Sequence, residues 1–204
     1  MDISKTVDMN ILDEKINHIS IVLASKSPRR QELLKNIFSD FNIEVREIDE
    51  TFPTSLKGGN IAQYISEQKA KAFISEKRDE LIITADTIVC LENQVLGKPK
   101  SFQEAYNMLR ALSGKTHVVY TGVSLLFKGE VTSFYDATRV SFYELSDEEI
   151  NYYINKHQPF DKAGSYGIQE WMGYVGIQKM EGDFFNVMGL PLHKLYREVN
   201  KLID

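Results

Sequence analysis

The chain has 204 residues, of which 43% are hydrophobic and 26% are charged, and its formal net charge is −5. This composition supports a packed core and excludes a wholly disordered chain. The acidic balance and the lack of a long basic run argue against binding to a nucleic-acid backbone. No apolar stretch approaches the length of a membrane span, and residues 1–10 lack the apolar core of a secretory signal. The single cysteine, Cys90, is interpreted as a buried small hydrophobe in a reducing compartment.

The N-terminal part of the chain divides into an appended arm and a strand that is followed by a helix. Residues 1–18 are expected to form the arm or a small helix, and residues 19–204 a single domain. The apolar run 19–24 predicts a buried strand. It breaks into Ser25-Lys26-Ser27-Pro28-Arg29-Arg30, where Pro28 suits the first position of a helix and Ser27 its N-cap.

The next segment alternates between strands and a helix. Asn60 is expected to cap the helix, with Gln63 as its capping-box partner. Strands are predicted from apolar patterns at residues 43–48, 81–83, 88–91 and 95–96, the last two forming a hairpin. The first of these strands ends in Asp49-Glu50, and the second leads into Thr84-Ala85-Asp86-Thr87.

Two helices in the second half open with capping boxes. One begins at Ser101, with Glu104 as its partner, and stops at Gly114. The other begins at Ser146, with Glu149 as its partner, and ends before the proline at position 159.

Long strands at residues 118–127 and 131–145, joined as a hairpin, lie between these two helices. Residues 163–189 are expected to be mostly loop and short strands, and Pro191 to start a last helix. The order of elements favours an α/β (α+β mixed) fold, in which helices flank a mixed central sheet and a cleft opens at strand ends.

Two arginines lie where a helix should disfavour them. Arg29 and Arg30 fall in the first turn after Pro28, at the positive end of the helix dipole. A bound anion would explain them, because free backbone N–H groups and two guanidinium groups would then all face phosphate. Ser25 and Ser27 belong to the same phosphate-binding candidate. The alternative is an N-cap followed by two solvated arginines.

Carboxylates and lysines complete the candidate site. Asp86 follows an apolar strand and Glu50 ends another, so the two could form a hard-oxygen site for Mg²⁺ or Mn²⁺. Alternatively, Asp86 only caps the turn after its strand. Lys69, at the edge of an apolar helix face, and Lys98, between Gly97 and Pro99, could neutralise a polyphosphate. Taken singly, each lysine is better explained as a solvated surface residue.

A glycine-containing segment, 161–169, could approach a ligand with its backbone, and Gln169 at its end could recognise a base edge. The alternative is a surface loop with a packing tyrosine. The chain has no GxxxxGK[ST], GxGxxG or GxSxG pattern. The four histidines show no metal-binding spacing and are expected to be structural: His18, His117, His157 and His193.

Six short motifs in the same order resemble the Maf family of nucleoside triphosphate pyrophosphatases, over about residues 19–203. The motifs are Ser25-Lys26-Ser27-Pro28-Arg29-Arg30, Ala85-Asp86-Thr87, Gly97-Lys98-Pro99, Leu112-Ser113-Gly114, residues 161–169 and Gly189-Leu190-Pro191. The resemblance implies a fold like that of inosine triphosphate pyrophosphatases. It also implies a metal-dependent hydrolase that cleaves a nucleoside triphosphate to the monophosphate and pyrophosphate, in the cytoplasm and often as a homodimer.

The resemblance also assigns roles to residues. Asp86 takes the place of the family's catalytic acid, and with Glu50 it is expected to hold the divalent metal. The positions for phosphate and metal handling fall on Ser25, Arg30, Glu50, Lys69 and Lys98. Three specificity positions look like the dTTP/UTP subgroup: Arg29, Thr87 and Gln169.

Two features depart from the family. The N-terminal arm has no counterpart, and Glu170-Trp171 stands where members usually continue with a small residue. Two other functions stay open. The protein could remove modified or purine triphosphates, or it could be a regulator of cell division that binds nucleotides without hydrolysis.

Overall fold

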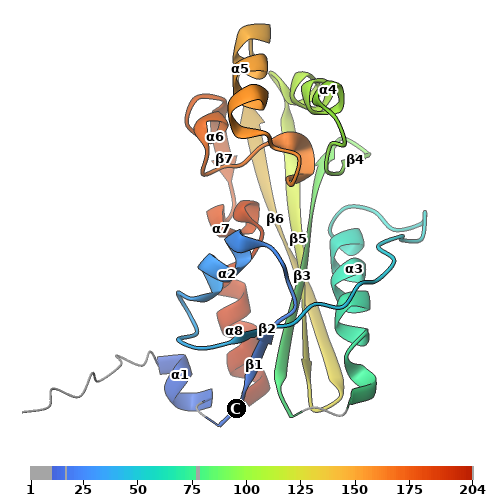
Figure 1. Ribbon diagram of the computed structural model, residues 1–204, viewed down its shortest axis with the longest axis vertical. Helices are drawn as coiled ribbons and strands as arrows, with labels where there is room; N and C mark the ends of the chain where they lie inside the picture. The colour runs from blue at the N-terminus through green and yellow to red at the C-terminus, as the bar shows by residue number, and fades with distance from the viewer. Residues whose placement is uncertain (1–10, 17, 77–78, 204) are drawn as a thin grey trace, which may run out of the picture.

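The structure, a computed structural model, describes residues 11–16, 18–76 and 79–203. Its centre is one mixed sheet with the strand order β2-β1-β3-β5-β6-β7, and β4 pairs with part of β3 (Figure 1). β1 runs parallel to β2 and β3, and the remaining pairings are antiparallel. The strands are β1 (Ile21–Leu23), β2 (Asn42–Ile43), β3 (Leu81–Leu91), β4 (Gln94–Leu96), β5 (Thr116–Phe127), β6 (Glu130–Phe142) and β7 (Ile177–Glu181).

Helices cover both faces of this sheet, which confirms the mixed α/β fold predicted from the sequence. Within the described ranges, no helix is both long and apolar enough to cross a bilayer. The helices are α1 (Ile11–Ile16), α2 (Pro28–Leu34), α3 (Gly59–Lys71), α4 (Phe102–Leu112), α5 (Asp147–His157), α6 (Trp171–Val175), α7 (Phe184–Met188) and α8 (Leu192–Ile203), with 3-10 turns η1 (Ile74–Glu76) and η2 (Ala163–Ser165).

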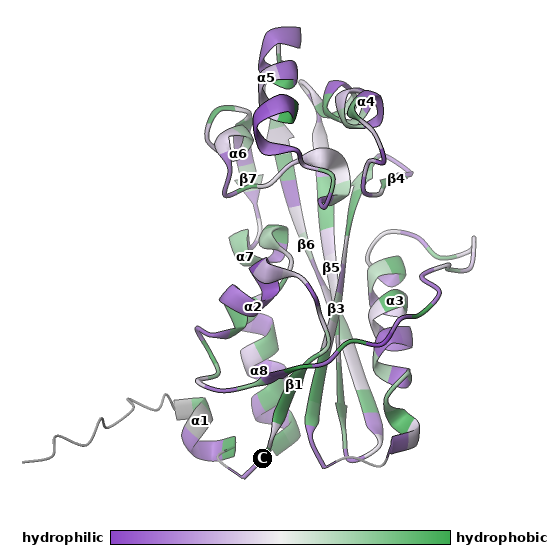
Figure 2. Cartoon of the chain, viewed as in Figure 1, coloured by the Kyte–Doolittle hydropathy of each residue, from purple (hydrophilic) through white to green (hydrophobic). Residues whose placement is uncertain are grey.

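Alternation along the strands divides the core between the two faces. On one face, Val123 packs beneath α1, α2 and α8, while Val119 of the same strand packs beneath α4 and α5. On the other face, Ile88 packs against α3. Figure 2 shows apolar residues concentrated along the long central strands. The two groups of helices on the first face therefore lie over opposite ends of β3 and β5.

Helix α3 lies unusually close to β5, and a glycine permits this approach. A Cβ on Gly122 would fall 2.2 Å from the backbone carbon of Ala62 in α3. Gly122 pairs with Asp86 across the sheet. The close approach therefore brings the side chains of α3 over the middle of β3.

Strand β3 is one strand of 11 residues, where the sequence predicted a short strand at 81–83 and a separate one at 88–91. Asp86 therefore lies in the middle of a strand, and its prediction at a strand end is wrong. The strand continues because β5 pairs with it from Ile82 to Cys90. By contrast, parallel pairing with β1 covers only its first three residues.

Two other local predictions are also wrong. The pattern at 43–48 forms a strand only at Asn42–Ile43, where both residues are exposed beside β1. Helix α3 begins at Gly59, and its N-cap is Gly58 and not Asn60. Gly58 adopts a φ of 53°, a left-handed conformation that glycine reaches without strain. The helix can therefore begin immediately after it, at Gly59. Gln63 donates to Glu67 and does not complete a capping box.

The remaining helix predictions are largely confirmed. The box from Ser146 to Glu149 is complete, whereas Ser101 accepts from Glu104 N but the Glu104 carboxylate accepts from Lys100 N. The segment 163–189 contains two short helices, α6 and α7, besides the expected loop and strand. Each has five residues, too few for an apolar period to be detected.

The N-terminal helix α1 packs against the domain. Leu12 and Ile16 are buried in the same core as Leu195 and Val199 of α8. The packing of α1 is therefore continuous with that of the domain, and the predicted boundary at residue 18 stays a prediction.

Candidate active site

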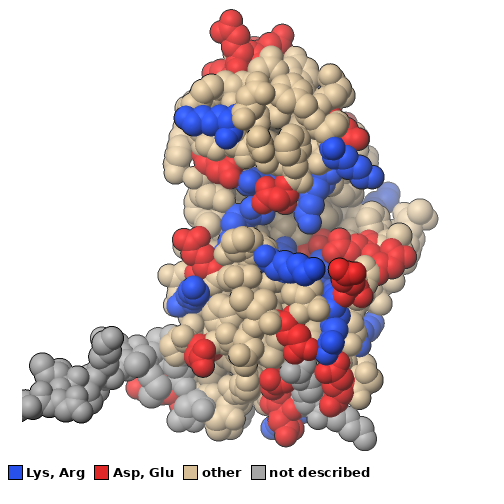
Figure 3. Space-filling view, viewed as in Figure 1, with Lys and Arg blue, Asp and Glu red and all other residues tan. Residues whose placement is uncertain are grey.

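All ten site residues predicted from the sequence line one cleft with a volume of about 570 Å³. Figure 3 shows basic and acidic side chains crowded across the middle of this face. The cleft brings together residues that are up to 144 positions apart: Ser25, Ser27, Arg29, Arg30, Glu50, Lys69, Asp86, Thr87, Lys98 and Gln169. The predicted residues therefore share one cleft, and their assignment as a site stays a prediction.

The cleft forms around the edge of β3 that β1 leaves uncovered. β1 ends at Leu23, opposite Ile83, so β3 continues past it without a parallel neighbour. Successive side chains on a strand point to opposite faces. Asp86 accordingly meets α3 on one face, while Thr87 meets α2 on the other. Because the edge is open, both side chains contribute to a single cleft.

Lys69 of α3 joins the two predicted metal ligands. Its Nζ lies 2.8 Å from Asp86 Oδ1 and 2.9 Å from Glu50 Oε1. Asp86 and Lys69 are mostly buried, whereas Glu50 is half exposed. Burial alone would raise the pKa of Glu50, but the hydrogen bond and charge of Lys69 outweigh it and lower the pKa. Both carboxylates are therefore held close together beside one ammonium group.

This pair of carboxylates fits a divalent cation. Mg²⁺ is usually held by one or two carboxylates, with water and substrate phosphates completing its shell. Asp86 and Glu50 supply two such carboxylates, and they share a single partner atom. A cation between them would take over contacts that Lys69 makes, which would free the ammonium for an anionic ligand.

Arg30 is fixed in the wall of the cleft by its own hydrogen bonds. Its guanidinium donates to Gly189 O at 2.8 Å, to Ala85 O at 2.9 Å and to Thr87 Oγ1 at 2.9 Å, with a longer bond to Ser25 Oγ at 3.4 Å. Burial lowers the pKa of Arg30, while the charge of Asp86 opposes this shift. Most of its N–H groups are thus used within the protein, and its charge is what it offers a ligand.

Ser27 and Ser25 form the turn at the start of α2. Ser27 occupies the N-cap position, as predicted, but its side chain makes no capping hydrogen bond. Instead, Ser27 N donates to the hydroxyl of the buried Ser25 at 3.2 Å. Ser25 therefore shapes the turn that presents Arg29 and Arg30.

A buried network of hydrogen bonds holds Thr87 and helix α7 in place. The Thr121 hydroxyl donates its proton to Asn186 O. In the bond between the two threonine hydroxyls, Thr87 is therefore the donor, and Thr87 also accepts from Arg30. Asn186 is fully buried and bonds Thr121 N, Val119 O and Thr138 Oγ1. These bonds fix α7 on the sheet and hold Gly189 against the guanidinium of Arg30.

The remaining predicted residues that line the cleft are Arg29, Lys98 and Gln169. Arg29 donates to Asp161 Oδ2 at 2.7 Å. Lys98 is exposed and, within the described residues, makes no ion pair. The backbone carbonyl of Gln169 accepts from Tyr174, while its amide has no hydrogen bond within the described chain and remains available to a ligand.

A family model described as "Maf-like protein" matches residues 20–202. The chain belongs to this family. A dTTP/UTP pyrophosphatase of Phocaeicola vulgatus is 51% identical over 191 residues, covering 93% of this chain and 99% of that protein. One of Bacteroides thetaiotaomicron is 49% identical over 189 residues, covering 92% and 98%.

A solved structure of the Staphylococcus aureus Ham1 protein is also similar to this Maf-like chain. It is 16% identical, covers 89% of this chain and 99% of that one, and has a TM-score of 0.49.

Four residues that line or support the cleft were not identified as functional candidates from the sequence. Lys162 forms ion pairs with both Asp161 and Glu170, and Asp161 also pairs with Arg29. Asn186 anchors α7. The alternation of charge around the glycines of 161–170 was a usable signal, because charged residues seldom enter a buried loop without partners. Nothing in the local sequence distinguishes Asn186 from a surface asparagine.

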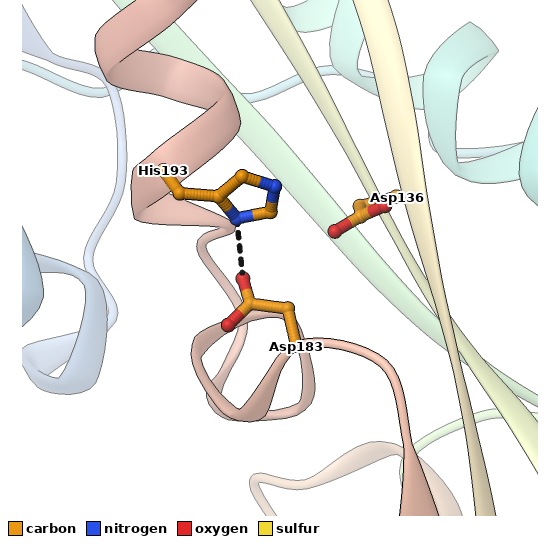
Figure 4. Close-up of side chains that lie close together, drawn as sticks. All are labelled: Asp136, Asp183 and His193. Atoms are coloured by element: carbon orange, nitrogen blue, oxygen red, sulfur yellow. Dashed lines mark hydrogen bonds and ion pairs between the residues drawn. The ribbon is translucent and has the colours of Figure 1, made fainter.

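Outside the cleft, Asp136, Asp183 and His193 bring one ligand atom each within 4.8 Å of one another (Figure 4). His193 Nδ1 lies 3.3 Å from Asp183 Oδ2, and Lys194 donates to Asp136. Asp183 also caps α7 through Phe185 N. Each group already has a partner within the protein, so the cluster is explained as an ion-pair network that fastens α7 and α8 to β6.

Proposed function

We propose that this protein hydrolyses dTTP and UTP to the monophosphate and pyrophosphate in a metal-dependent reaction. The observation that carries the proposal is the Lys69 ammonium group between Asp86 and Glu50, in a cleft that also contains Arg30 and Lys98. Three cations and two carboxylates suit a polyphosphate with its metal ion. The relatives described as dTTP/UTP pyrophosphatases support the substrate class.

The chemical task is the attack of water on the α-phosphorus, which negative oxygens shield. Asp86 would orient the water and accept its proton as the new P–O bond forms. The bond from the α-phosphorus to the bridging oxygen then breaks, and pyrophosphate leaves. A divalent ion held by Asp86 and Glu50 would neutralise phosphate charge and polarise the phosphoryl group.

The remaining residues bind and orient the substrate. Lys69, Lys98 and Arg30 would neutralise the phosphates, and backbone N–H groups of the turn after Ser25, other than that of Ser27, would bind the terminal phosphate. Gln169 and Arg29 would recognise the O4/N3 edge of a pyrimidine, and Thr87 would shape its pocket. For the protein as a whole, we propose a cytoplasmic location and a homodimer, in line with the family resemblance.

Pyrophosphate release from a panel of canonical and modified triphosphates tests the proposal, with and without a chelator. We expect dTTP and UTP to be hydrolysed best and the chelator to abolish turnover. Asp86→Asn should lose at least about a hundredfold in kcat, the scale typical of a general base. Asp136→Asn, outside the cleft, is the control and should keep its turnover.

Each competing function has its own outcome in this panel. Preference for purine or modified triphosphates would replace the proposed substrate class. Nucleotide and metal binding without any hydrolysis would support a regulator instead. An Asp86→Asn variant with nearly full turnover would remove Asp86 from the mechanism.

A further inference from the structure

We infer that Lys162, Glu170 and Asp161 form a positioning network that sets base selectivity, by holding Arg29 and Gln169 in place. This inference rests on the proposed function, because it concerns the nucleoside side of the same cleft. The contacts, burial and charge balance of the three residues support it independently.

The first support is a continuous chain of ion pairs. Arg29 Nη1 lies 2.7 Å from Asp161 Oδ2, and Lys162 Nζ lies 2.7 Å from the other oxygen of that carboxylate. The same Nζ lies 2.9 Å from Glu170 Oε1. A single path of charged groups therefore runs from Arg29 to the residue that follows Gln169.

The second support is the burial of Lys162. Its side chain is 9% exposed, so its charge needs both of its carboxylate partners. Loss of Glu170 would leave Asp161 as the main partner of Lys162. Asp161 would then be drawn toward Lys162, and the orientation of Arg29 would loosen.

The third support is that Glu170 is anchored at both oxygens. Its Oε2 accepts from Tyr153 at 2.5 Å, and the same tyrosine oxygen accepts from Gly167 N at 3.0 Å. A Cβ at Gly167 would lie 2.9 Å from the Glu170 carboxyl carbon and 3.1 Å from Lys162 Cε. The loop is therefore packed tightly around this carboxylate, which also holds the adjacent residue, Gln169, in place.

The fourth support is electrostatic. Two cations, Arg29 and Lys162, are matched by two carboxylates, Asp161 and Glu170, so this side of the cleft carries no spare charge. On the other side, the three cations Arg30, Lys69 and Lys98 exceed the two carboxylates of Asp86 and Glu50 by one charge. A neutral, hydrogen-bonding wall suits an uncharged base, whereas the other side suits phosphates.

Calorimetric titration separates this role from a merely structural one. The probes are UMP, GMP and inorganic pyrophosphate, measured on the wild-type protein and on Glu170→Gln. We expect UMP affinity to fall about tenfold, because a hydrogen-bonded charged group is lost, while GMP and pyrophosphate change less than about twofold. Glu181→Gln, an exposed carboxylate that is also paired with a lysine, is the control and should leave all three unchanged.

The kinetic counterpart is a fall in the ratio of kcat/KM for dTTP to that for GTP, through KM more than kcat. If UMP and pyrophosphate affinities fall together, the network is structural and the inference is overturned. It is also overturned if neither affinity changes. If Glu170→Gln does not fold, Asp161→Asn tests the Arg29 end with the same probes, since the Asp161 side chain is 58% exposed. A wild-type protein that binds UMP but hydrolyses no triphosphate would refute the proposed function and leave this test intact.

Discussion

His117 should make the protein lose stability between neutral and mildly acidic pH. The residue is 1% exposed, its Nε2 lies 2.7 Å from the Tyr166 hydroxyl, and its Nδ1 has no partner within the described chain. Burial lowers the pKa of His117 from 6.5 to about 4. The folded protein therefore keeps this ring neutral over a range in which the unfolded chain protonates it.

The lower pKa of His117 in the folded protein makes the free energy of unfolding depend on pH. Because the folded pKa lies below the unfolded value, the contribution is nil above about pH 7 and destabilising as the pH falls toward 4. At 1.36 kcal/mol for each pH unit of pKa difference, the full effect is about 3 kcal/mol, and about 2 kcal/mol is reached at pH 5. Below about pH 4 both states are protonated, and the effect levels off.

Urea unfolding of His117→Gln at several pH values between 5 and 7.5 measures this contribution. The glutamine amide can still bond the Tyr166 hydroxyl, so the variant removes the titration and keeps the contact. We expect the free energy of unfolding to depend less on pH in His117→Gln than in the wild type, by about 2 kcal/mol at pH 5. His193→Gln, whose ring is 59% exposed, is the control. Parallel pH profiles for the wild type and His117→Gln would refute the reasoning.

Two further predictions concern the support of the cleft. Gly189→Ala places a Cβ at a φ of 112° and 3.3 Å from Thr87 Oγ1, so it should destabilise the fold by about 1–3 kcal/mol. Thermal melting should show a lower Tm, whereas Gly97→Ala, which has open space around it, should melt like the wild type. Asn186→Leu deprives Thr121 N, Val119 O and Thr138 of a buried partner and should cost at least about 3 kcal/mol in urea unfolding. An unchanged unfolding midpoint in either variant would contradict its prediction.

The sequence predicted the cleft better than it predicted the strand that forms it. Each site motif is local, so the candidate residues could be identified without knowing how they meet. That Asp86 lies within a strand depends on its pairing with Gly122 of β5, a partner 36 positions away. Local apolar runs carry no information about such pairing, and the polar residues between two runs resembled a strand end.

Two other features differ from the sequence predictions because they also depend on contacts between distant residues. The pattern at 43–48 is that of a strand, but only Asn42 and Ile43 have a neighbour to pair with. Lys162 contacts Asp161 and Glu170, and Glu170 also contacts Tyr153. The positions of these residues in the sequence do not reveal the contacts. Capping at Ser146 was predictable because it is settled within four residues.

Because β1 is much shorter than β3, the cleft is lined by residues of the sheet and also by residues of connecting segments. Asp86 and Thr87 lie on a strand that is paired continuously with β5, so they share the rigidity of the whole sheet. By contrast, Gln169 lies in a connecting segment. If Gln169 recognises the base as proposed, substitutions in its segment would alter which nucleoside is accepted while Asp86 and Thr87 keep their places in the sheet. A scaffold of this kind can diverge in its choice of substrate without rebuilding its chemistry.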